Sequence, residues 1–560
     1  MKSDILIECV PNFSEGRDME IIRQITDEIT KIDGVRLLDV DPGKATNRTV
    51  VTFVGHPDAV IDAAFQAIKK ASEVIDMSIH KGEHPRMGAT DVCPLIPISG
   101  ITMHELASYA HKLGKRVGEE LNLPIYMYES AANTPQRKNL ANIRSGEYEG
   151  LPSKLNDPIW KPDYGPAIFN SFSGATVIGA RDFLVAYNVN LNTTSVKRAN
   201  SVAFDVRENG RIKTDAKGKN LIGADGTPVR IPGTCKSVKA IGWYIEEYGI
   251  AQISMNLTNI KETSLHVAFD ACCKSAEKRG LRVTGSELVG LVPKSVLIDA
   301  GKYFLNKQKR SVGVSEKELI HIAVRSLGLD ELAPFDASKK VIEYVLEGET
   351  KDALIQKNLI EFADETASES PAPGGGSISA YVGVLGVSLG TMVANLSAQK
   401  QGWDDKIDYF SEKAEEGQIL KTKLMTLVDA DTNAFNKILE AIRMPKGTEE
   451  EKLSRKKEMH AATIQAIEVP LKVMRTSLEA LSLLKEMAEN GNPNSVSDAG
   501  VGAMCARTAV EGAALNVRIN CSGFDDQKYI LDAVSQADFM LNQAKTIEEE
   551  IISIVEKLII

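Results

Sequence analysis

Residues 35–55 have the sequence VRLLDVDPGKATNRTVVTFVG, and this stretch decides the fold of the first half of the chain. Two apolar, β-branched runs, residues 35–41 and 48–55, are typical of strands, and a Pro-Gly turn signal lies between them. Helical patterns precede and follow these runs, at residues 18–32 and 57–75. This order predicts a sheet that is covered by helices.

Further strands and one more helix extend the pattern in both directions. The helix, residues 102–121, opens on Thr102 with Glu105 three residues later, which is a capping box. The predicted order is β-α-β-β-α-β, with a helix and a strand appended. The additional strands are expected at residues 5–10, 92–98 and 124–129.

The following segment repeats the same order. Two units of like topology predict a pair of subdomains, and ligand sites often form where two such units meet. The polar segment 209–236 is expected to form an exposed loop or hairpin. The expected strands are residues 175–191, 238–246, 250–257 and 282–292, and the expected helices are residues 194–208 and 264–278.

After about residue 345 the pattern becomes helical almost throughout. We therefore predict an α/β protein of two βαββαβ-like subdomains, followed by an all-α helical bundle. Turn signals divide the helical part at residues 371–376, 445–447 and 490–494. The predicted domains are subdomains at 1–183 and 184–345, a linker at 346–354 and a helical domain at 355–560.

The composition excludes some classes of protein. The chain of 560 residues has a net charge of −10, whereas non-specific nucleic-acid binding needs a basic surface. The seven cysteines are an odd number without a C-x-x-C pair, which predicts reduced thiols and a cytoplasmic location. Asp4 and Glu8 interrupt the apolar stretch at the N-terminus, so we expect a first strand there and not a signal peptide.

Residues 370–399 contain no charged residue, and a stretch of this length is compatible with a membrane span. The stretch also contains Ser, Thr, Asn and several Gly residues, and it is less apolar than a leucine-rich span. We therefore favour a buried helix of the bundle and expect no contact with a membrane.

The richest polar cluster is HKGEHPRMG at residues 80–88. Two imidazoles, two cations and a carboxylate so close together suit the binding of an anion during a proton transfer. The H-x-x-x-H spacing also suggests a metal pair, but Gly82 and Pro85 disfavour the helix that such a pair needs. An acid/base loop is favoured, a structural loop is the alternative, and we expect no metal or nucleotide site.

Two other segments carry candidate binding residues. Asp39 or Asp41 could orient an imidazole, although the same pattern is found in a plain turn between strands. Residues 165–174, GPAIFNSFSG, place two aromatic and two serine residues between glycines. Such a loop is able to approach a flat heterocycle closely.

In the helical part, residues 405–442 have the pattern of one long helix. Position 431 belongs on its apolar stripe and is an aspartate, and a buried acid needs a partner or a function. Asp429 points away from the stripe and is expected to be solvated. Capping of a neighbouring helix, or a pair with an arginine such as Arg518, is the alternative for Asp431. The stripe consists of Leu420, Leu424, Leu427, Phe435, Ile438 and Ile442.

The segment PAPGGGS at residues 371–377 precedes the uncharged helix. Successive glycines before a helix expose backbone N–H groups, which suit an anion or a carbonyl group. Ser377 is expected to be the N-cap of that helix, and Asp498 to be an N-cap or a supporting residue elsewhere in the bundle.

Five segments together are far more specific than one short motif: ECVPNFSEG at 8–16, TNRT at 46–49, HKGEHPRMG at 80–88, GWY at 242–244 and GSELVGLVP at 285–293. They resemble the formimidoyltransferase-cyclodeaminase family, and the resemblance continues through the helical part. It implies that the formimino group of N-formimino-L-glutamate passes to N5 of tetrahydrofolate, releasing glutamate. It implies further that N10 closes onto the formimino carbon, giving 5,10-methenyltetrahydrofolate and ammonia.

The resemblance also implies functional residues and partners. It implies His84 and Asp431 as catalytic residues, tetrahydrofolate as a co-substrate that we expect to be polyglutamylated, and a homo-oligomer. The folate loop that it implies consists of Gly165, Pro166, Ala167, Ile168, Phe169, Asn170, Ser171, Phe172, Ser173 and Gly174. From charge and position we expect substrate to be bound by Asp41, Arg48, Lys81 and Arg86.

Three alternatives remain open at this point. The transferase could move a formyl group, the helical domain could be a methenyltetrahydrofolate cyclohydrolase, or the chain could be a folate-binding scaffold without catalysis. The residues do not decide the first two, because formimino and formyl groups differ by one nitrogen against one oxygen. The presence of both His84 and Asp431 argues against the scaffold, because binding alone needs no proton-transfer group.

Overall fold

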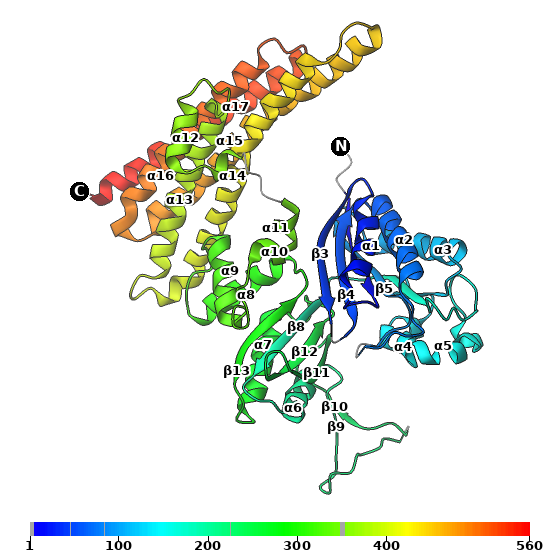
Figure 1. Cartoon of the computed structure of the whole chain (residues 1–560). Coiled ribbons are helices and arrows are strands. Elements are labelled where there is room, and N and C mark those ends of the chain that lie inside the picture. Colours follow the sequence, from blue (N-terminus) through cyan, green and yellow to red (C-terminus); the bar gives the residue numbers. More distant parts are fainter. Residues whose placement is uncertain (1–4, 45, 83–84, 225, 348–352, 560) are drawn as a thin grey trace. The chain divides into compact units, whose positions relative to one another are not determined.

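The computed structural model describes residues 5–44, 46–82, 85–224, 226–347 and 353–559. These residues form two compact units, Met1–Val296 with Leu327–Gly348, and Leu297–Ser326 with Glu349–Ile560. The predicted domain boundaries stay predictions, but residues 297–326 pack with the helices rather than with the sheets. The first unit contains the two large sheets and the second is helical, as the predicted fold class requires (Figure 1).

The first sheet combines antiparallel and parallel strands. The strand order is β3-β4, then β1 and β2, then β5-β7-β6. Strands β1 and β2 follow one another in a single position between β4 and β5, and the last three strands are parallel. One face of this sheet packs its apolar side chains against α1, α2 and α3. The elements are β1 Leu6–Cys9, β2 Asn12–Phe13, β3 Val35–Gly43, β4 Arg48–Gly55, β5 Thr90–Ser99, β6 Ile125–Glu129, β7 Thr176–Ala180, α1 Met19–Thr30, α2 Pro57–Val74 and α3 Met103–Glu120.

The opposite face of the first sheet has its own core. Because side chains alternate along a strand, Tyr126 and Tyr128 of β6 point away from α3 and pack with Ile143, Leu151 and Leu155. The last three residues belong to two short helices that the sequence did not predict, α4 Leu140–Arg144 and α5 Glu147–Leu155. Both helices lie between β6 and β7 in the chain. Helix α5 lies next to the segment 80–88 and the loop 165–174.

The second sheet is antiparallel throughout, in the order β11-β12-β8-β13. This order matches β3-β4-β1-β5 of the first sheet, so the predicted pair of units with like topology is confirmed. The elements are β8 Val185–Leu191, α6 Val196–Val206, β11 Val238–Ile245, β12 Ile250–Leu257, α7 Leu265–Glu277 and β13 Val283–Val289. After β13 the chain continues through α8 Lys294–Lys307, α9 Glu316–Leu327, α10 Ala337–Lys340 and α11 Ile342–Glu347.

One predicted strand is wrong. Residues 175–191 form two strands in different sheets, β7 in the first and β8 in the second. Residues 181–184, Arg-Asp-Phe-Leu, connect them without a glycine or a proline, so the sequence has no strong turn signal at the crossing. The prediction of an exposed excursion at 209–236 is confirmed. Its two short strands, β9 Arg211–Ile212 and β10 Arg230–Ile231, pair with each other, and further backbone hydrogen bonds run within the segment.

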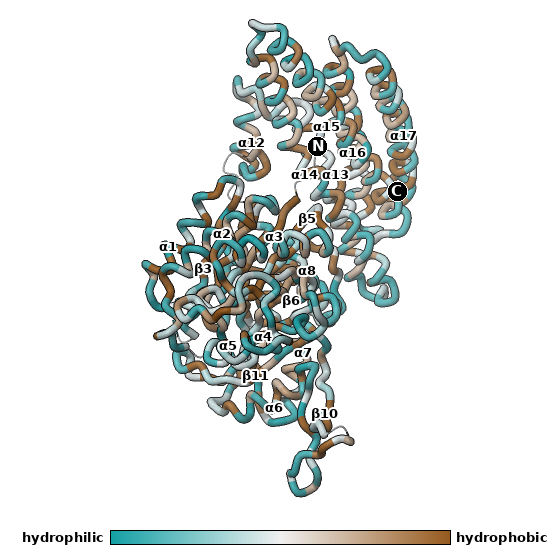
Figure 2. Tube along the Cα trace, turned by 90° about the vertical axis from the view of Figure 1, so that its right-hand side faces the viewer, coloured by the Kyte–Doolittle hydropathy of each residue, from teal (hydrophilic) through white to brown (hydrophobic). Residues whose placement is uncertain are grey.

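The helical unit is an antiparallel bundle. Successive helices run in opposite directions, because residue numbers rise on one helix as they fall on the next. The contact pairs that show this are Thr391–Gly417 with Gly376–Asp431, Lys423–Glu479 with Lys437–Gln465, and Arg518–Asp538 with Arg507–Glu548. Hydrophobic and hydrophilic residues alternate along these helices in Figure 2. The helices are α12 Leu359–Thr366, α13 Gly375–Ala398, α14 Ile407–Arg443, α15 Glu449–Asn490, α16 Val496–Cys521 and α17 Gln527–Ile559.

Helix α13 is the uncharged segment of the sequence. It is long and apolar enough to cross a membrane, but 61% of its most apolar window is buried inside the bundle. Its residues Ala380, Val384, Val387 and Ala394 belong to the main hydrophobic core of the helical unit. Helix α13 therefore packs as the buried bundle helix that its Ser, Thr and Gly content favours.

Two candidate active sites

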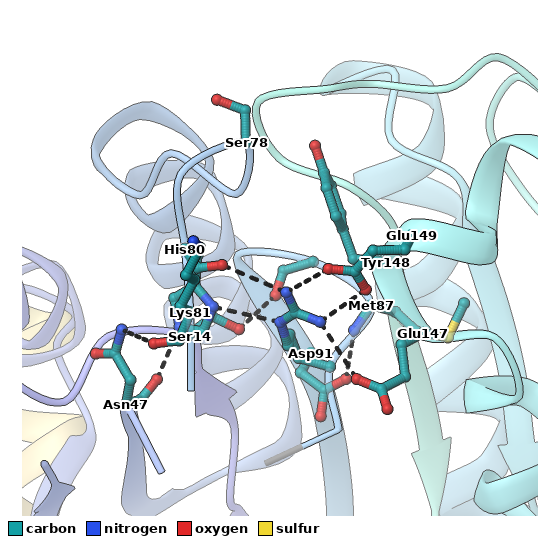
Figure 3. A network of polar contacts seen from close by, with 12 residues as sticks. Ser14, Asn47, Ser78, His80, Lys81, Met87, Asp91, Glu147, Tyr148 and Glu149 are labelled. Carbon is teal, nitrogen blue, oxygen red and sulfur yellow. Dashed lines mark hydrogen bonds and ion pairs between the residues drawn. The ribbon is translucent and has the colours of Figure 1, made fainter. Parts of the chain in front are cut away.

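Asn47 joins three of the segments that the sequence singles out. Its backbone carbonyl accepts a hydrogen bond from His80 Nε2 at 2.9 Å, and its side-chain nitrogen donates to the Lys81 carbonyl at 3.0 Å. Its side-chain oxygen accepts from the Gly16 N–H at 3.1 Å. Asn47 is buried and has a φ of 47°, a left-handed conformation that asparagine adopts more readily than most residues. Figure 3 shows this junction.

These contacts fix the tautomer of His80. A carbonyl only accepts hydrogen bonds, so Nε2 carries the proton that it shares with Asn47. Nδ1 then accepts from Arg86 Nε at 3.3 Å. Burial lowers the pKa of His80, and the positive charge of Arg86 acts in the same direction. His80 is therefore a neutral, structural imidazole that holds the segment 80–88 in place.

Arg86 is buried, and its guanidinium has five N–H groups to satisfy. Nη1 donates to Glu147 at 3.2 Å and to Glu149 at 2.9 Å, while Nη2 donates to Glu149 at 2.7 Å and to the His80 carbonyl at 3.3 Å. With the bond from Nε to His80, all five donors are occupied. The expected role of Arg86 in binding a substrate carboxylate stays a prediction, and it requires these glutamates to leave.

The predicted folate loop lies directly against the segment 80–88. Gly88 and Gly174 form a β-bridge, the Ala175 N–H donates to the Met87 carbonyl at 3.1 Å, and the Ala89 N–H donates to the Ser173 carbonyl at 2.8 Å. Gly174 has a φ of 68°, and a Cβ there would lie 2.2 Å from the Met87 carbonyl oxygen. Only glycine fits at this crossing.

The loop itself presents apolar groups on a firm backbone. The Asn170 side-chain oxygen accepts from the Phe172 and Ser173 N–H groups, both at 3.0 Å. Ile168 is 70% exposed and Phe172 is 40% exposed, whereas Phe169 packs against the ring of Tyr148. An ordered loop that exposes apolar side chains suits a flat heterocycle.

The other predicted substrate-binding residues lie nearby in the first unit. Arg48 is in an ionic group with Asp41, Asp91 and Arg144, and burial lowers its pKa to about 10. Lys81 is exposed and lines a pocket of about 450 Å³ together with Gly82, Arg86, Gly146, Glu147 and Glu149. His84, the predicted catalytic histidine, lies outside the described residues.

A larger hollow of about 540 Å³ lies elsewhere, among α1, α2 and α3. Four of its charged side chains are paired with one another, in the contacts of Lys112 with Asp58 at 2.8 Å and of Arg116 with Asp62 at 2.7 Å. Neither the segment 80–88 nor the loop 165–174 contributes a residue to its lining. We therefore place the first candidate site at the crossing of Gly88 and Gly174 and not in the larger hollow.

Two residues of this region are not predicted from the sequence. Glu8 of β1 is buried, and burial raises its pKa to about 7, opposed by Arg181. The sequence signal for Glu8 is a charged residue inside an apolar strand, which by itself argues only against a signal peptide. Tyr148 had no signal, because its helix α5 is short and lacks a clear apolar period.

The second candidate site lies where α13 begins beside α14. The N-cap of α13 is Gly374, so the prediction that Ser377 is the N-cap is wrong. Ser377 is three residues further on, where its hydroxyl donates to the Val428 carbonyl at 2.8 Å and approaches Asp431 Oδ2 at 3.4 Å. Burial raises the pKa of Asp431, and hydrogen bonds from Ser377 oppose this shift.

Glycine at position 376 makes room for the Asp431 carboxyl group. A Cβ at Gly376 would lie 2.2 Å from Asp431 Oδ1 and 2.4 Å from its carboxyl carbon. On the neighbouring residue, a Cβ at Gly375 would lie 3.4 Å from the side-chain nitrogen of Asn516. Asp431 and Asn516, from α14 and α16, therefore both face the glycines that begin α13.

Two details of the helix prediction differ from the structure. Leu420, Leu424 and Leu427 are buried as predicted, but Phe435 is 42% and Ile442 is 48% exposed. The cause is that α13 starts at the level of Asp431, so α14 has no α13 beside it beyond this point. Asp429 is not simply solvated either, because it accepts the Leu354 N–H at 2.7 Å.

The alternatives for Asp431 and Asp498 are also decided by their neighbours. Arg518 pairs with Asp538 at 2.7 Å, so it is not the partner of Asp431. Asp498 lies in the first turn of α16, whose N-cap is Ser495. Asp431 instead accepts hydrogen bonds from the backbone and the side chain of Ser377 in the first turn of α13, as the capping alternative requires, and the residue is half-buried.

Comparison with known proteins assigns both halves of the chain. Family models match residues 6–181 (formiminotransferase domain, N-terminal subdomain), 186–347 (formiminotransferase domain) and 358–538 (formiminotransferase-cyclodeaminase). The formimidoyltransferase-cyclodeaminase of Mus musculus is 42% identical over 542 residues, which cover 97% of each chain. The chain belongs to the formimidoyltransferase-cyclodeaminase family.

Two further relatives correspond to separate halves of this family's architecture. The glutamate formimidoyltransferase of Thermoplasma acidophilum is 42% identical over 302 residues, 54% of this chain and 92% of its own. The methenyltetrahydrofolate cyclohydrolase of Methylorubrum extorquens is 34% identical over 190 residues, 34% of this chain and 91% of its own. The chain thus combines a formimidoyltransferase with a cyclodeaminase and is a bifunctional, folate-dependent enzyme.

The neutral state of His80 predicts a pH dependence of stability. The pKa of His80 is lowered in the folded chain, and the pKa of histidine in the unfolded chain is about 6.5. The contribution of neutral His80 to the free energy of unfolding is therefore complete above about pH 6.5 and is lost as the pH falls below it. Between about pH 7.5 and pH 5.5, His80→Gln should therefore lose less stability than the unsubstituted chain in urea unfolding. His104→Gln, on the exposed side of α3, is the matched control. Equal pH dependence in His80→Gln and the unsubstituted chain would contradict the assignment.

Because the Asp431 carboxyl group occupies the space beside Gly376, a side chain at this position should reduce the cyclodeaminase activity selectively. Gly376→Ala places a methyl group on the Asp431 carboxyl group and should reduce cyclodeaminase turnover about a hundredfold, because a misplacement of about 1 Å has that effect. Transferase turnover should be unchanged. Gly374→Ala is the control, since a Cβ there meets nothing closer than 4.0 Å. Full cyclodeaminase activity in Gly376→Ala would show that the position of Asp431 is unimportant.

Proposed function

We propose that His84 and the loop 165–174 form the formimidoyltransferase site, and that Asp431 is the catalytic acid of the cyclodeaminase. The observation that supports the first site is the backbone crossing of Gly88 with Gly174, which joins the segment of His84 to the loop that resembles a folate site. The observation that supports the second is the half-buried carboxyl group of Asp431 beside glycines at the start of α13.

In the transferase reaction, N5 of tetrahydrofolate attacks the formimino carbon of N-formimino-L-glutamate and forms a tetrahedral carbon. N5 loses a proton, the bond from that carbon to the glutamate nitrogen breaks, and the departing nitrogen gains a proton. One imidazole near neutral pKa is able to perform both transfers in turn, which is the role we propose for His84. Arg48 and Lys81 are the proposed ligands of substrate carboxylates, with Asp41 beside them.

In the cyclodeaminase reaction, N10 attacks the formimino carbon on N5. The carbon–nitrogen bond to the amino group breaks, and ammonia leaves with its bonding electrons after gaining a proton, while N10 loses one. Burial raises the pKa of Asp431, which favours the protonated acid that this step needs. Ser377 is placed to hold that acid toward the glycines.

Substituting the two proposed catalytic residues should block different steps. In an absorbance assay for methenyltetrahydrofolate combined with ammonia detection, His84→Ala should lose both products by about a hundredfold or more, because general acid–base catalysis contributes that much. Asp431→Ala should accumulate 5-formimidoyltetrahydrofolate and release glutamate normally. His104→Ala and Asp408→Ala, both exposed, are the controls. If Asp431→Ala still releases ammonia at the original rate, another residue is the acid.

The cyclohydrolase relative supports one competing activity for the helical unit. Its likeness covers 34% of this chain, which corresponds to the helical part alone. Cyclohydrolase chemistry adds water to the methenyl carbon, whereas cyclodeamination expels ammonia from the formimino carbon. Supplying methenyltetrahydrofolate and formimidoyltetrahydrofolate separately distinguishes them, and faster turnover of the methenyl compound would replace our proposal for this unit.

We also propose a cytoplasmic enzyme that uses polyglutamylated folate. All seven cysteines are free thiols, which is typical of a reducing compartment. Cell fractionation tests the location, and detection of the chain outside the cytoplasm would refute it. A comparison of KM for mono- and polyglutamylated tetrahydrofolate tests the second point, and equal values would refute it.

A homo-oligomer is supported by apolar side chains that the helical unit leaves exposed. On α16, Leu515 is 64% and Ile519 is 67% exposed. We expect Leu515→Glu combined with Ile519→Glu to lower the molecular mass in analytical ultracentrifugation, because charges on an apolar interface oppose association. Leu453→Glu, an exposed leucine near the start of α15, is the control. An unchanged mass would place the interface elsewhere.

A further inference from the structure

The first turn of α5, residues Glu147 to Gly150, contacts both segments of the transferase site. On one side, Glu147 and Glu149 hold the Arg86 guanidinium, and the Tyr148 N–H donates to the Arg86 carbonyl at 2.8 Å. On the other side, the Tyr148 hydroxyl donates to the Ser171 carbonyl of the loop 165–174. The turn is therefore a bridge between the segment 80–88 and the loop 165–174. Figure 3 shows the first of these two sides, with Glu147, Tyr148 and Glu149.

Tyr148 makes its two contacts with different parts of the residue. Its ring packs against Phe169, with 5.4 Å between the ring centroids, and its hydroxyl reaches the backbone two residues further along the same loop. Burial raises the pKa of Tyr148, so the hydroxyl keeps its proton and remains a donor. Ring and hydroxyl together fix the middle of the loop, where the apolar side chains are exposed.

The turn does little of the packing that holds α5 to the sheet. Leu151 and Leu155 are the α5 residues in the core under the first sheet, whereas Tyr148 is half-buried and Glu149 is exposed. The chain enters the turn through two successive left-handed residues, Gly146 with a φ of 86° and Glu147 with a φ of 53°. Such a conformation in a non-glycine residue is uncommon and requires support from its surroundings, which the Arg86 contact provides.

We propose that Tyr148 and Glu149 are positioning residues of the transferase: Tyr148 holds the folate loop for binding, and Glu149, with Glu147, holds the segment of His84 for turnover. This inference rests on the proposed function, because it assumes that the loop 165–174 binds folate. It assigns separate consequences to two adjacent residues. Loss of the tyrosine contact should affect folate affinity, and loss of the glutamate contacts should affect the rate of transfer.

The test uses the full chain and two readouts. Hydrogen exchange of residues 165–174, titrated with tetrahydrofolate, reports folate at this loop apart from the cyclodeaminase site. Transferase kinetics give kcat and the KM for each substrate.

Tyr148→Phe removes only the hydroxyl contact, and Tyr148→Ala also removes the ring. The double variant Glu147→Gln with Glu149→Gln weakens the contacts with Arg86. Tyr126→Phe is the tyrosine control, since it loses a hydroxyl bond to the Trp160 carbonyl of 2.8 Å. Glu120→Gln is the glutamate control, since it pairs with Arg116 on α3.

We expect Tyr148→Phe to require about fivefold more tetrahydrofolate for half-protection of the loop, as loss of one hydrogen bond predicts, with kcat and the KM for formiminoglutamate unchanged. Tyr148→Ala should require more than Tyr148→Phe. The double glutamine variant should lower kcat about fivefold and leave the folate titration unchanged. Both controls should match the unsubstituted chain.

Other outcomes overturn the inference. If the loop of the unsubstituted chain is protected by tetrahydrofolate but Tyr148→Phe titrates identically, Tyr148 does not position it. If the double glutamine variant keeps full kcat, or loses kcat and folate affinity together, the separate roles are wrong. If tetrahydrofolate does not protect the loop even in the unsubstituted chain, the failure lies in the proposed folate site and not in the role of the turn.

Discussion

The transferase half depends on the close approach of two backbones at Gly88 and Gly174. Neither position has space for a side chain, because a Cβ at either one would lie within 2.5 Å of a carbonyl oxygen on the other segment. This approach sets the register of the 80–88 segment against the loop 165–174. The polar network of Asn47, His80 and Arg86 then builds on a backbone whose position is already determined.

A glycine also makes a close approach possible in the helical half. At Gly376 the space that a side chain would take is occupied by the Asp431 carboxyl group, whereas at Gly88 and Gly174 it is occupied by backbone atoms. Because α13 begins at this level, α14 loses a neighbour just beyond Asp431, so the acid lies at the border between packed core and open surface. A border position explains how the group is desolvated enough to hold a proton and still open to a ligand.

The sequence predicted the repeating elements well because strand and helix periods are local properties of the chain. It located Asp431 by the same argument, as an acid on an apolar stripe. It failed where the outcome depended on distant partners: the crossing at residues 181–184, the short helices α4 and α5, and the N-cap of α13. Arg86 shows the limit for site residues, since its charge suggested a substrate ligand, whereas Glu147 and Glu149, about sixty residues later in the chain, occupy its donors.

The excursion between α6 and β11 has a practical use. Its short strands Arg211–Ile212 and Arg230–Ile231 hydrogen-bond to each other, and most side chains between them face solvent. It contributes no residue to the hydrophobic cores of the first sheet or of the bundle. The excursion is therefore a suitable place to insert a tag or a fluorophore. An insertion there would leave the strand pairing of the second sheet unchanged, and even a bulky group would be tolerated.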